Sequence, residues 1–234
     1  MLVAADLEAA AAELRRELSL DEPFRDPGVG EFGLANCVFA IGDCFLEIVS
    51  PVRDGTAAGR QLDRAGADGG YMVLFDLEDL DGARERAERC GVRTVWRIDL
   101  PDISGTHTHP ADLRGAIVSL DCSRPYGTWR WGGPAWTNAT GQGAAGRLDG
   151  VTLAVADPQR QAARWGEVLG VEVASAAPQR PTLLTSDGAR VAFAAAPAGA
   201  PEQLVEIALR VPARVRAGRE SIQFGAARLA LADL

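Results

Sequence analysis

Two histidines, His107 and His109, lie close together in the segment Ile103–Asp121, and they are the only histidines among the 234 residues. Because they are two residues apart, they would point to the same side of a β-strand. Histidine is the commonest metal ligand in proteins and the usual acid or base near neutral pH. The pair is therefore a candidate for metal binding or catalysis, and the alternative is a turn that carries two imidazoles.

Composition narrows the classes of partner. The net charge is -8, and all 24 basic residues are arginine, so lysine Schiff-base and phosphate-loop chemistry are excluded. The acidic balance, without blocks of like charge, predicts neither nucleic-acid nor membrane partners. No apolar stretch is long enough to span a membrane, and the first residues lack the features of a signal peptide. We therefore expect a cytoplasmic protein, a monomer or homodimer, that binds a small molecule.

The four cysteines form no C-x-x-C motif. A hairpin turn predicted at residues 42–43 pairs Cys44 with Ile41 and leaves Cys37 near Ile48, so a disulfide between these two cysteines is not expected. The pattern predicts four buried, reduced thiols, as is usual inside the cell.

A repeated unit organises the chain. Short apolar strands that begin at Leu2, Phe75 and Leu153 are each followed by an aspartate and an amphipathic helix. Such an aspartate can cap the helix by accepting hydrogen bonds from its first free backbone N–H groups. The predicted caps are Asp6, Asp79 and Asp157, and the predicted buried faces are Leu7, Ala11, Leu14 and Leu18, then Leu80, Ala83 and Ala87, and then Ala162, Trp165 and Leu169.

Strand-like segments follow each helix, so the unit is strand–helix–strand–strand–strand. It occurs about three and a half times, because a fourth unit opens at residues 204–211 without a helix of its own and closes at residues 221–231. This order predicts an α+β fold. The stretch from Tyr126 to Gly146 interrupts the pattern and is predicted to connect two halves of the chain.

Three tryptophans lie in that connecting stretch: Trp129, Trp131 and Trp136. Trp129 and Trp131 alternate, so they would face the same way in an extended segment. They either pack the linker across the two halves or form the wall of an apolar ligand pocket, since aromatic rings offer a large contact area.

Three segments in this order resemble the vicinal oxygen chelate superfamily, which includes glyoxalase I, methylmalonyl-CoA epimerase and extradiol dioxygenases. They are "IGDCFLEIVSPV" from Ile41, "GGYMVLFDLEDLDGARERAERCGV" from Gly69 and "THTHPADLRGAIVSLD" from Thr106. The resemblance implies paired βαβββ modules that form two half-open barrels around metal sites. The first barrel would be residues 1–125, the linker 126–147, and the second, incomplete barrel 148–234.

The resemblance also implies where metal ligands would stand, on the first and last strands of each module. Glu47 and Glu206 are the carboxylates found there, whereas the other positions carry Met72, Ser119, Gly150, Ala192 and Ala230. A divalent metal needs three or four converging ligands to replace its lost water. We therefore predict neither a metal nor another cofactor. We also expect the native start to lie upstream of Met1, because the first strand begins late in its unit.

The same comparison places both histidines in the loop before the last strand of the second module, away from ligand positions. They are then turn or pocket-rim residues, or a substrate acid or base partnered by Asp112 or Asp102. Three roles are open for Glu47 and for Glu206. Each is a former metal ligand that is now hydrogen-bonded or paired with arginine, or it is a catalytic base, or it is an exposed strand residue.

Metal-independent binding of a small molecule is the leading functional prediction. The alternatives are a metal-dependent lyase, epimerase or dioxygenase acting on a small organic substrate, and a purely structural partner protein. We place the pocket in the first barrel, because the second has mostly glycine and alanine at the corresponding positions. The candidate catalytic residues are Glu47, His109 and His107, and the candidate pocket residues are Tyr71, Met72, Ser119, Trp129 and Trp131.

Overall fold

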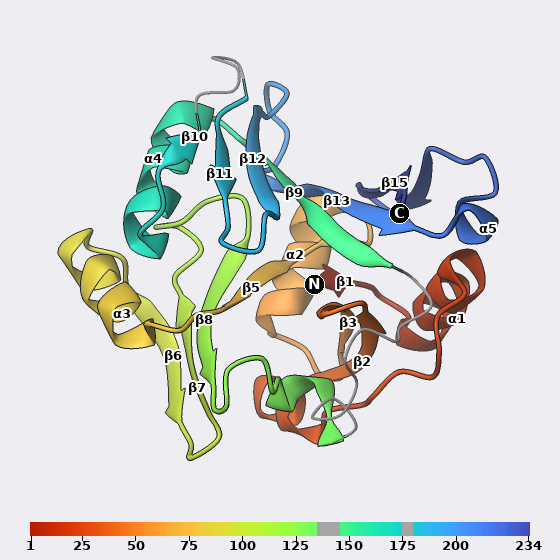
Figure 1. Ribbon diagram of the computed structural model, residues 1–234, viewed down its shortest axis with the longest axis horizontal. Coiled ribbons are helices and arrows are strands. Elements are labelled where there is room, and N and C mark those ends of the chain that lie inside the picture. The colour runs from red at the N-terminus through yellow and green to blue at the C-terminus, as the bar shows by residue number, and fades with distance from the viewer. Residues whose placement is uncertain (135–145, 175–179) are drawn as a thin grey trace. The chain divides into compact units, whose positions relative to one another are not determined.

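The computed structural model describes residues 1–134, 146–174 and 180–234 (Figure 1). The chain forms two compact units, each assembled from separate stretches of sequence. Unit 1 contains Met1–Tyr71, Trp131–Asp149 and Val205–Leu234, and unit 2 contains Met72–Arg130 and Gly150–Leu204. The first and fourth repeats thus lie mainly in unit 1, and the second and third mainly in unit 2. The predicted barrels, residues 1–125 and 148–234, are each a continuous stretch of chain, whereas each compact unit combines separate stretches. The division into two barrels stays a prediction.

Unit 1 has one four-stranded sheet in the order β2-β3-β1-β4 and three further strands in the order β13-β15-β14. Strand β1 is parallel to β3 and antiparallel to β4. Its elements are β1 (Leu2–Val3), α1 (Leu7–Leu18), the 3-10 helix η1 (Pro27–Phe32), β2 (Leu34–Ile41), β3 (Cys44–Pro51), α2 (Ala57–Ala65), β4 (Gly69–Gly70), β13 (Gln203–Val211), α5 (Ala213–Arg216), β14 (Ser221–Phe224) and β15 (Ala227–Asp233).

Unit 2 has strands in the orders β5-β8-β7-β6 and β10-β11-β12-β9. Strands β9 and β13 each have residues in both units. The elements of unit 2 are β5 (Met72–Asp76), α3 (Leu80–Arg89), β6 (Thr94–Asp99), β7 (Ile103–Thr108), β8 (Ile117–Ser123), β9 (Arg147–Val155), α4 (Pro158–Leu169), β10 (Val173–Ala174), β11 (Thr182–Leu184) and β12 (Arg190–Ala195). The short 3-10 helix η2 (Arg130–Gly132) lies at the boundary.

The three predicted helix caps are confirmed. The Asp6 side chain accepts from the Ala9 N–H at 3.0 Å, and Asp79 and Asp157 do the same three residues into their own helices. The predicted apolar faces of α1 and α3 are buried in full, whereas in α4 the buried residue at the end of the face is Val168 rather than Leu169. These features are local, so the sequence pattern specifies them directly.

Three elements differ from expectation. Helix α2 was not predicted, because it is rich in alanine, glycine and charged residues, and it buries only Ala58 and Gln61. The fourth repeat has a one-turn helix, α5, where none was expected. His107 lies on strand β7 rather than in a loop, because β7 extends to Thr108.

The predicted hairpin register is confirmed, with Ile41 opposite Cys44 and Cys37 opposite Ile48. All four cysteines are free, as expected. The expectation that all four are buried is wrong. Cys37 is buried, whereas Cys44, Cys90 and Cys122 are partly exposed. Cys44 opens β3 and Cys90 directly follows α3, while Cys122 lies between the buried Asp121 and Ser123 and so faces the other side of β8.

The centre of the unit 2 core is Trp165 of α4, which is fully buried. Its ring meets Phe75 of β5 edge-on, with centroids 6.3 Å apart, and Phe193 of β12 at 5.6 Å. Such aromatic pairs add to the stability that comes from burying apolar surface. The indole Nε1 has no hydrogen-bond partner among the described residues, so the ring contributes through packing.

Trp165→Ala is expected to lower the free energy of unfolding by about 3–5 kcal/mol, because it leaves a large cavity in this core. Trp165→Phe is the matched control and should lose clearly less, since the indole N–H makes no bond that phenylalanine would forfeit. Chemical denaturation of both variants measures the difference. Equal losses would show that packing at this position is not what stabilises unit 2.

Candidate functional site

Glu47 lies at the middle of strand β3 in unit 1 and is partly exposed. The Asn36 side chain donates from Nδ2 to Glu47 Oε1 at 2.8 Å, and its Oδ1 accepts from the Asp26 backbone N–H at 2.9 Å. Asn36 is only 3% exposed. Because both ends of its amide are engaged, Asn36 holds the Glu47 carboxylate in one orientation.

The environment of Glu47 favours its protonated form. Burial raises the pKa of its carboxyl to about 7, and the hydrogen bond from Asn36 opposes this shift. The α-amino group of Met1 and the Asp26 carboxylate are the charged groups nearby that also act on it, with opposite signs. A carboxyl group that titrates near neutral pH can both accept and return a proton, as a general base or acid must.

Tyr71 and Met72 stand next to each other at the boundary of the two units, and both are buried. Burial raises the pKa of the Tyr71 phenol to about 12, so it stays a neutral donor. The Tyr71 backbone N–H donates to the Met1 carbonyl at 3.1 Å. Met72 begins β5, and its thioether is a poor ligand for a hard divalent cation.

A polar face lies on the β5-β8-β7-β6 sheet of unit 2. In the register of β7 and β8, His107 is opposite Ser119 and Gly105 is opposite Asp121. These four residues therefore share one face of the sheet. Ser119 and Asp121 are buried.

Asp121 is a candidate site residue that the sequence reasoning missed. It is 1% exposed, and burial raises the pKa of its carboxyl to about 7, against the hydrogen bond from Ser119. The Ser119 hydroxyl donates to Asp121 Oδ1 at 2.8 Å. Its spacing was a usable signal, because Asp121 is two residues beyond the predicted pocket residue Ser119 and so faces the same side of the strand.

His107 is partly exposed on β7, and its ring lies against Trp96 of β6 with centroids 4.4 Å apart. Burial lowers the pKa of the imidazole to about 4, so it is neutral at physiological pH. A neutral imidazole can still bind a ligand, and its predicted catalytic role stays a prediction.

His109 directly follows β7 and makes the hydrogen bonds of a turn. Its Nδ1 accepts from the Ala111 N–H at 3.1 Å, and its backbone N–H donates to the Arg93 carbonyl at 2.8 Å. Of the carboxylates considered as its partners, Asp112 pairs with Arg93, whose guanidinium also lies 3.2 Å from His109 Nδ1, and Asp102 pairs with Arg130, each ion pair at 2.8 Å. These contacts support the turn interpretation, and catalysis by His109 remains a prediction.

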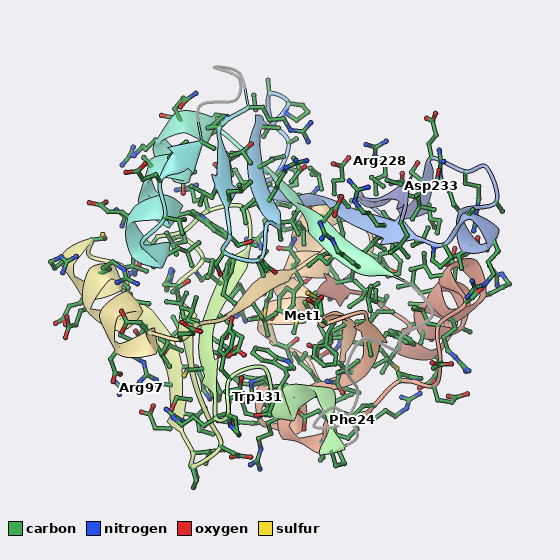
Figure 2. All side chains as sticks on the ribbon, viewed as in Figure 1. Met1, Phe24, Arg97, Trp131, Arg228 and Asp233 are labelled. Carbon is green, nitrogen blue, oxygen red and sulfur yellow. The ribbon has the colours of Figure 1, made fainter. Side chains whose placement is uncertain are left out.

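Trp129 and Trp131 are both partly exposed. The prediction that these two side chains alternate along an extended segment is wrong, because residues 130–132 form the 3-10 helix η2. Two glycines after Trp131 lie against aromatic rings of unit 1: a Cβ on Gly132 would come within 2.3 Å of Phe45, and one on Gly133 within 2.6 Å of Phe24. Phe24 and Trp131 are labelled in Figure 2. Trp136 lies outside the described residues.

Glu206 forms an ion pair with Arg228, its in-register partner on β15. Arg228 is labelled in Figure 2. The pairing matches one of the alternatives considered for Glu206, a carboxylate held by arginine.

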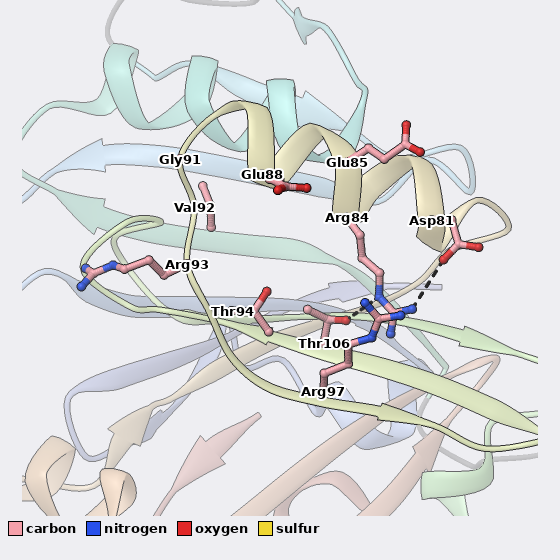
Figure 3. A pocket seen from close by; sticks show the side chains of 10 residues that line it. All are labelled: Asp81, Arg84, Glu85, Glu88, Gly91, Val92, Arg93, Thr94, Arg97 and Thr106. Carbon is pink, nitrogen blue, oxygen red and sulfur yellow. Dashed lines mark hydrogen bonds and ion pairs between the residues drawn. The ribbon is translucent and has the colours of Figure 1, made fainter.

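A hollow of about 680 Å³ lies in unit 2 between α3 and the start of β6 (Figure 3). None of the site residues predicted from the sequence lines it. Its arginines are already paired, Arg84 and Arg97 with Asp99 and Arg93 with Asp112. Arg84 also pairs with Asp81, and Glu85 and Glu88 line the hollow as well, so it has no excess positive charge with which to attract an anion.

The ligand positions implied for a metal do not fit one. Ser119 donates its hydrogen bond to Asp121, and Glu206 is engaged by Arg228. Within the part of the chain that the structure describes, no group of three or more His, Cys, Asp or Glu side chains is arranged to hold a metal ion.

In the same residues, no helix has the length and apolar character needed to cross a membrane.

Comparison with known proteins gives one relative and several similar folds. No protein-family model matches the chain. The ethylmalonyl-CoA/methylmalonyl-CoA epimerase of Cereibacter sphaeroides is 28% identical over 124 residues, which are 50% of this chain and 89% of the relative. A mutant of 4-hydroxymandelate synthase from Streptomyces coelicolor has a TM-score of 0.66 at 14% identity, over 94% of this chain and 74% of that one. A hypothetical protein from Staphylococcus aureus has a TM-score of 0.68 at 9% identity, over 100% and 98%.

Proposed function

Because the chain belongs to the vicinal oxygen chelate superfamily and has its α+β fold of βαβββ modules, we propose that it binds a small organic molecule without a metal ion and that Glu47 exchanges a proton with that molecule. One observation carries the proposal: a partly exposed carboxyl on β3, oriented by Asn36, that titrates near neutral pH. A group with these properties is matched to proton transfer at physiological pH.

The name of the relative suggests a class of ligand. Methylmalonyl-CoA and ethylmalonyl-CoA, which the relative's name contains, each have a hydrogen on the carbon between a carboxylate and a thioester carbonyl. Removal of that proton by the Glu47 carboxylate leaves the electron pair of the C–H bond on the thioester, as an enolate. Return of the proton from Glu47 restores the C–H bond. The step needs no oxidant or reductant, and it leaves the carboxylate as it began.

The donor set supports metal independence. The described residues bring no third metal-binding side chain to Glu47, and the serine and methionine at two other implied ligand positions are poor ligands for a divalent ion. The rival function, a metal-dependent lyase, epimerase or dioxygenase, would need ligands that these positions lack.

After dialysis, the purified protein is expected to contain far less than one equivalent of zinc, iron, nickel, cobalt or manganese. The reason is the residue set at the implied ligand positions, which offers one carboxylate in each predicted barrel where about three or four ligands are needed. Elemental analysis by mass spectrometry measures the content. Close to one equivalent of any of these metals would favour the metal-dependent alternative.

Calorimetric titration of chelator-treated protein with methylmalonyl-CoA tests the binding function, and free coenzyme A is the control for recognition of the acyl group. We expect the thioester to bind and coenzyme A to bind more weakly. Binding of methylmalonyl-CoA that appears only after a divalent metal is added, or no binding at all, would contradict the proposal.

A further inference from the structure

Strand β1 places Glu47 and Tyr71 in one row of the unit 1 sheet. Because Leu2 is opposite Ile48 on the parallel strand β3, the residue before it, Met1, is opposite Glu47. The antiparallel register with β4 sets Tyr71 on the other side of Met1, where the Tyr71 backbone N–H donates to the Met1 carbonyl at 3.1 Å. Register partners point to the same face of a sheet, so Glu47 and Tyr71 share a face.

This row lies on the more open face of the sheet. The neighbouring row holds Leu2 and Ile48, which are fully buried, and side chains alternate between the two faces along a strand. Glu47, by contrast, is partly exposed. Neighbouring strands lie about 4.8 Å apart, so two spacings separate the backbones of Glu47 and Tyr71 by roughly 10 Å. At that separation the two long side chains can reach one small molecule from opposite sides.

The Tyr71 hydroxyl is a donor without an acceptor. The residue is 7% exposed, and its hydroxyl makes no hydrogen bond to any residue that the structure describes. It is absent from the fully enclosed side-chain atoms that lack a partner among these residues, so it keeps contact with solvent. Burial raises the pKa of the phenol to about 12, and the proton therefore stays on its oxygen at neutral pH.

Two charged side chains of unit 1 act on this phenol. The Arg60 guanidinium of α2 lowers the pKa that burial has raised, and the Glu47 carboxylate raises it further. Arg60 donates to the Gly55 carbonyl at 2.7 Å and forms no ion pair with a residue in the described part of the chain. Its positive charge is therefore not cancelled by a carboxylate, and it favours negative charge that develops beside the phenol.

From this arrangement we infer that Tyr71 is a catalytic residue, whose hydroxyl donates a hydrogen bond to the thioester carbonyl oxygen while Glu47 exchanges the proton on the neighbouring carbon. The inference rests on the proposed function for the reaction. As the C–H bond breaks, its electron pair moves onto the thioester and the negative charge develops on that oxygen. A donor that is fixed before the reaction stabilises such a charge. Tyr71 keeps its own proton throughout, so return of the proton from Glu47 restores both residues.

Tyr71→Phe removes the hydroxyl alone and tests the inference in chelator-treated protein. Deuterium incorporation at carbon 2 of methylmalonyl-CoA should slow by about 10²–10³-fold, the usual loss for one donor to a developing oxyanion. Calorimetry should show thioester binding within about threefold of wild type, because the hydrogen bond strengthens only as the charge develops. The urea midpoint should be unchanged, since no hydrogen bond within the protein is lost.

Tyr126→Phe is the matched control, because Tyr126 is the only other tyrosine in the chain. It belongs to unit 2, where its hydroxyl donates to the Asp76 carbonyl at 3.4 Å. Exchange by Tyr126→Phe should stay within about twofold of wild type, since no donor to the oxyanion is removed.

The outcomes separate this inference from the proposed function. If wild type exchanges the proton and Tyr71→Phe does so at the same rate, or loses binding as much as exchange, the inference alone is overturned. If wild type neither binds the thioester nor exchanges its proton, the proposed function fails.

A measurement on the wild-type protein decides the inference even where Tyr71→Phe does not fold. Tyrosine labelled with ¹³C at Cζ gives one NMR signal for each of the two tyrosines, and Tyr126→Phe shows which signal belongs to Tyr71. We expect saturating methylmalonyl-CoA to shift the Tyr71 signal. A Tyr71 signal that does not move while calorimetry shows the thioester bound would overturn the inference.

Discussion

Glu47→Gln is expected to slow proton exchange at carbon 2 of methylmalonyl-CoA by about 10²–10⁴-fold, the usual contribution of a general base. Glutamine has the size of glutamate and can still accept the hydrogen bond that Asn36 donates to Oε1 at 2.8 Å. It cannot take up a proton. The variant should therefore keep the fold and bind the thioester while losing turnover. Deuterium incorporation followed by NMR measures the rate.

Glu206→Gln is the matched control for this substitution. Glu206 also lies on a strand of unit 1, but it is paired with Arg228, whose side chain is 49% exposed. Loss of such a pair costs little stability. Exchange by Glu206→Gln should stay within about twofold of wild type, since no catalytic base is removed. Equal losses in both variants, or a loss confined to Glu206→Gln, would show that Glu47 is not the proton acceptor.

The difference in free energy of unfolding between Asp121→Asn and wild type is expected to shift in favour of the variant by roughly 3 kcal/mol when the pH is raised from 5 to 8. Burial raises the pKa of Asp121 in the folded protein to about 7, above the ordinary aspartate value of about 3.9. Between these two values the folded chain binds more protons than the unfolded chain, so wild-type stability falls as pH rises and levels off above about pH 7. Asparagine does not titrate, and it does not share this loss.

Urea denaturation of both proteins at pH 5 and pH 8 measures this change in the stability gap. Other titrating groups, Glu47 among them, are common to wild type and variant, so their contributions cancel in the difference. A gap that is the same at both pH values would show that Asp121 is not held in its neutral form in the folded protein.

The sequence predicted what is decided locally. Asp6, Asp79 and Asp157 cap their helices because a cap depends on residues within one turn. The hairpin around residues 42–43 has the expected register for the same reason. Helix α2 escaped prediction, since Ala57–Ala65 is short and buries only Ala58 and Gln61.

The site was predicted only in part, because its key contacts are not local. Glu47 was recognised from its strand, but nothing in the sequence marked Asn36, eleven residues away, as the side chain that orients it. Asp121 was passed over because the comparison with the superfamily drew attention to Ser119, although its spacing from Ser119 places both side chains on the same face of the strand. Which repeats share a unit is likewise decided by packing between distant segments, which chain order does not specify.

The central claim is that Glu47 moves a proton on a small organic molecule without a metal ion. Deuterium incorporation at carbon 2 of methylmalonyl-CoA, catalysed by chelator-treated wild-type protein in D₂O at pH 7.5, tests it most directly. The account predicts incorporation well above the protein-free rate that does not change when zinc, cobalt or manganese is added back. Incorporation that is absent in the chelated protein and restored by one of these metals would contradict it.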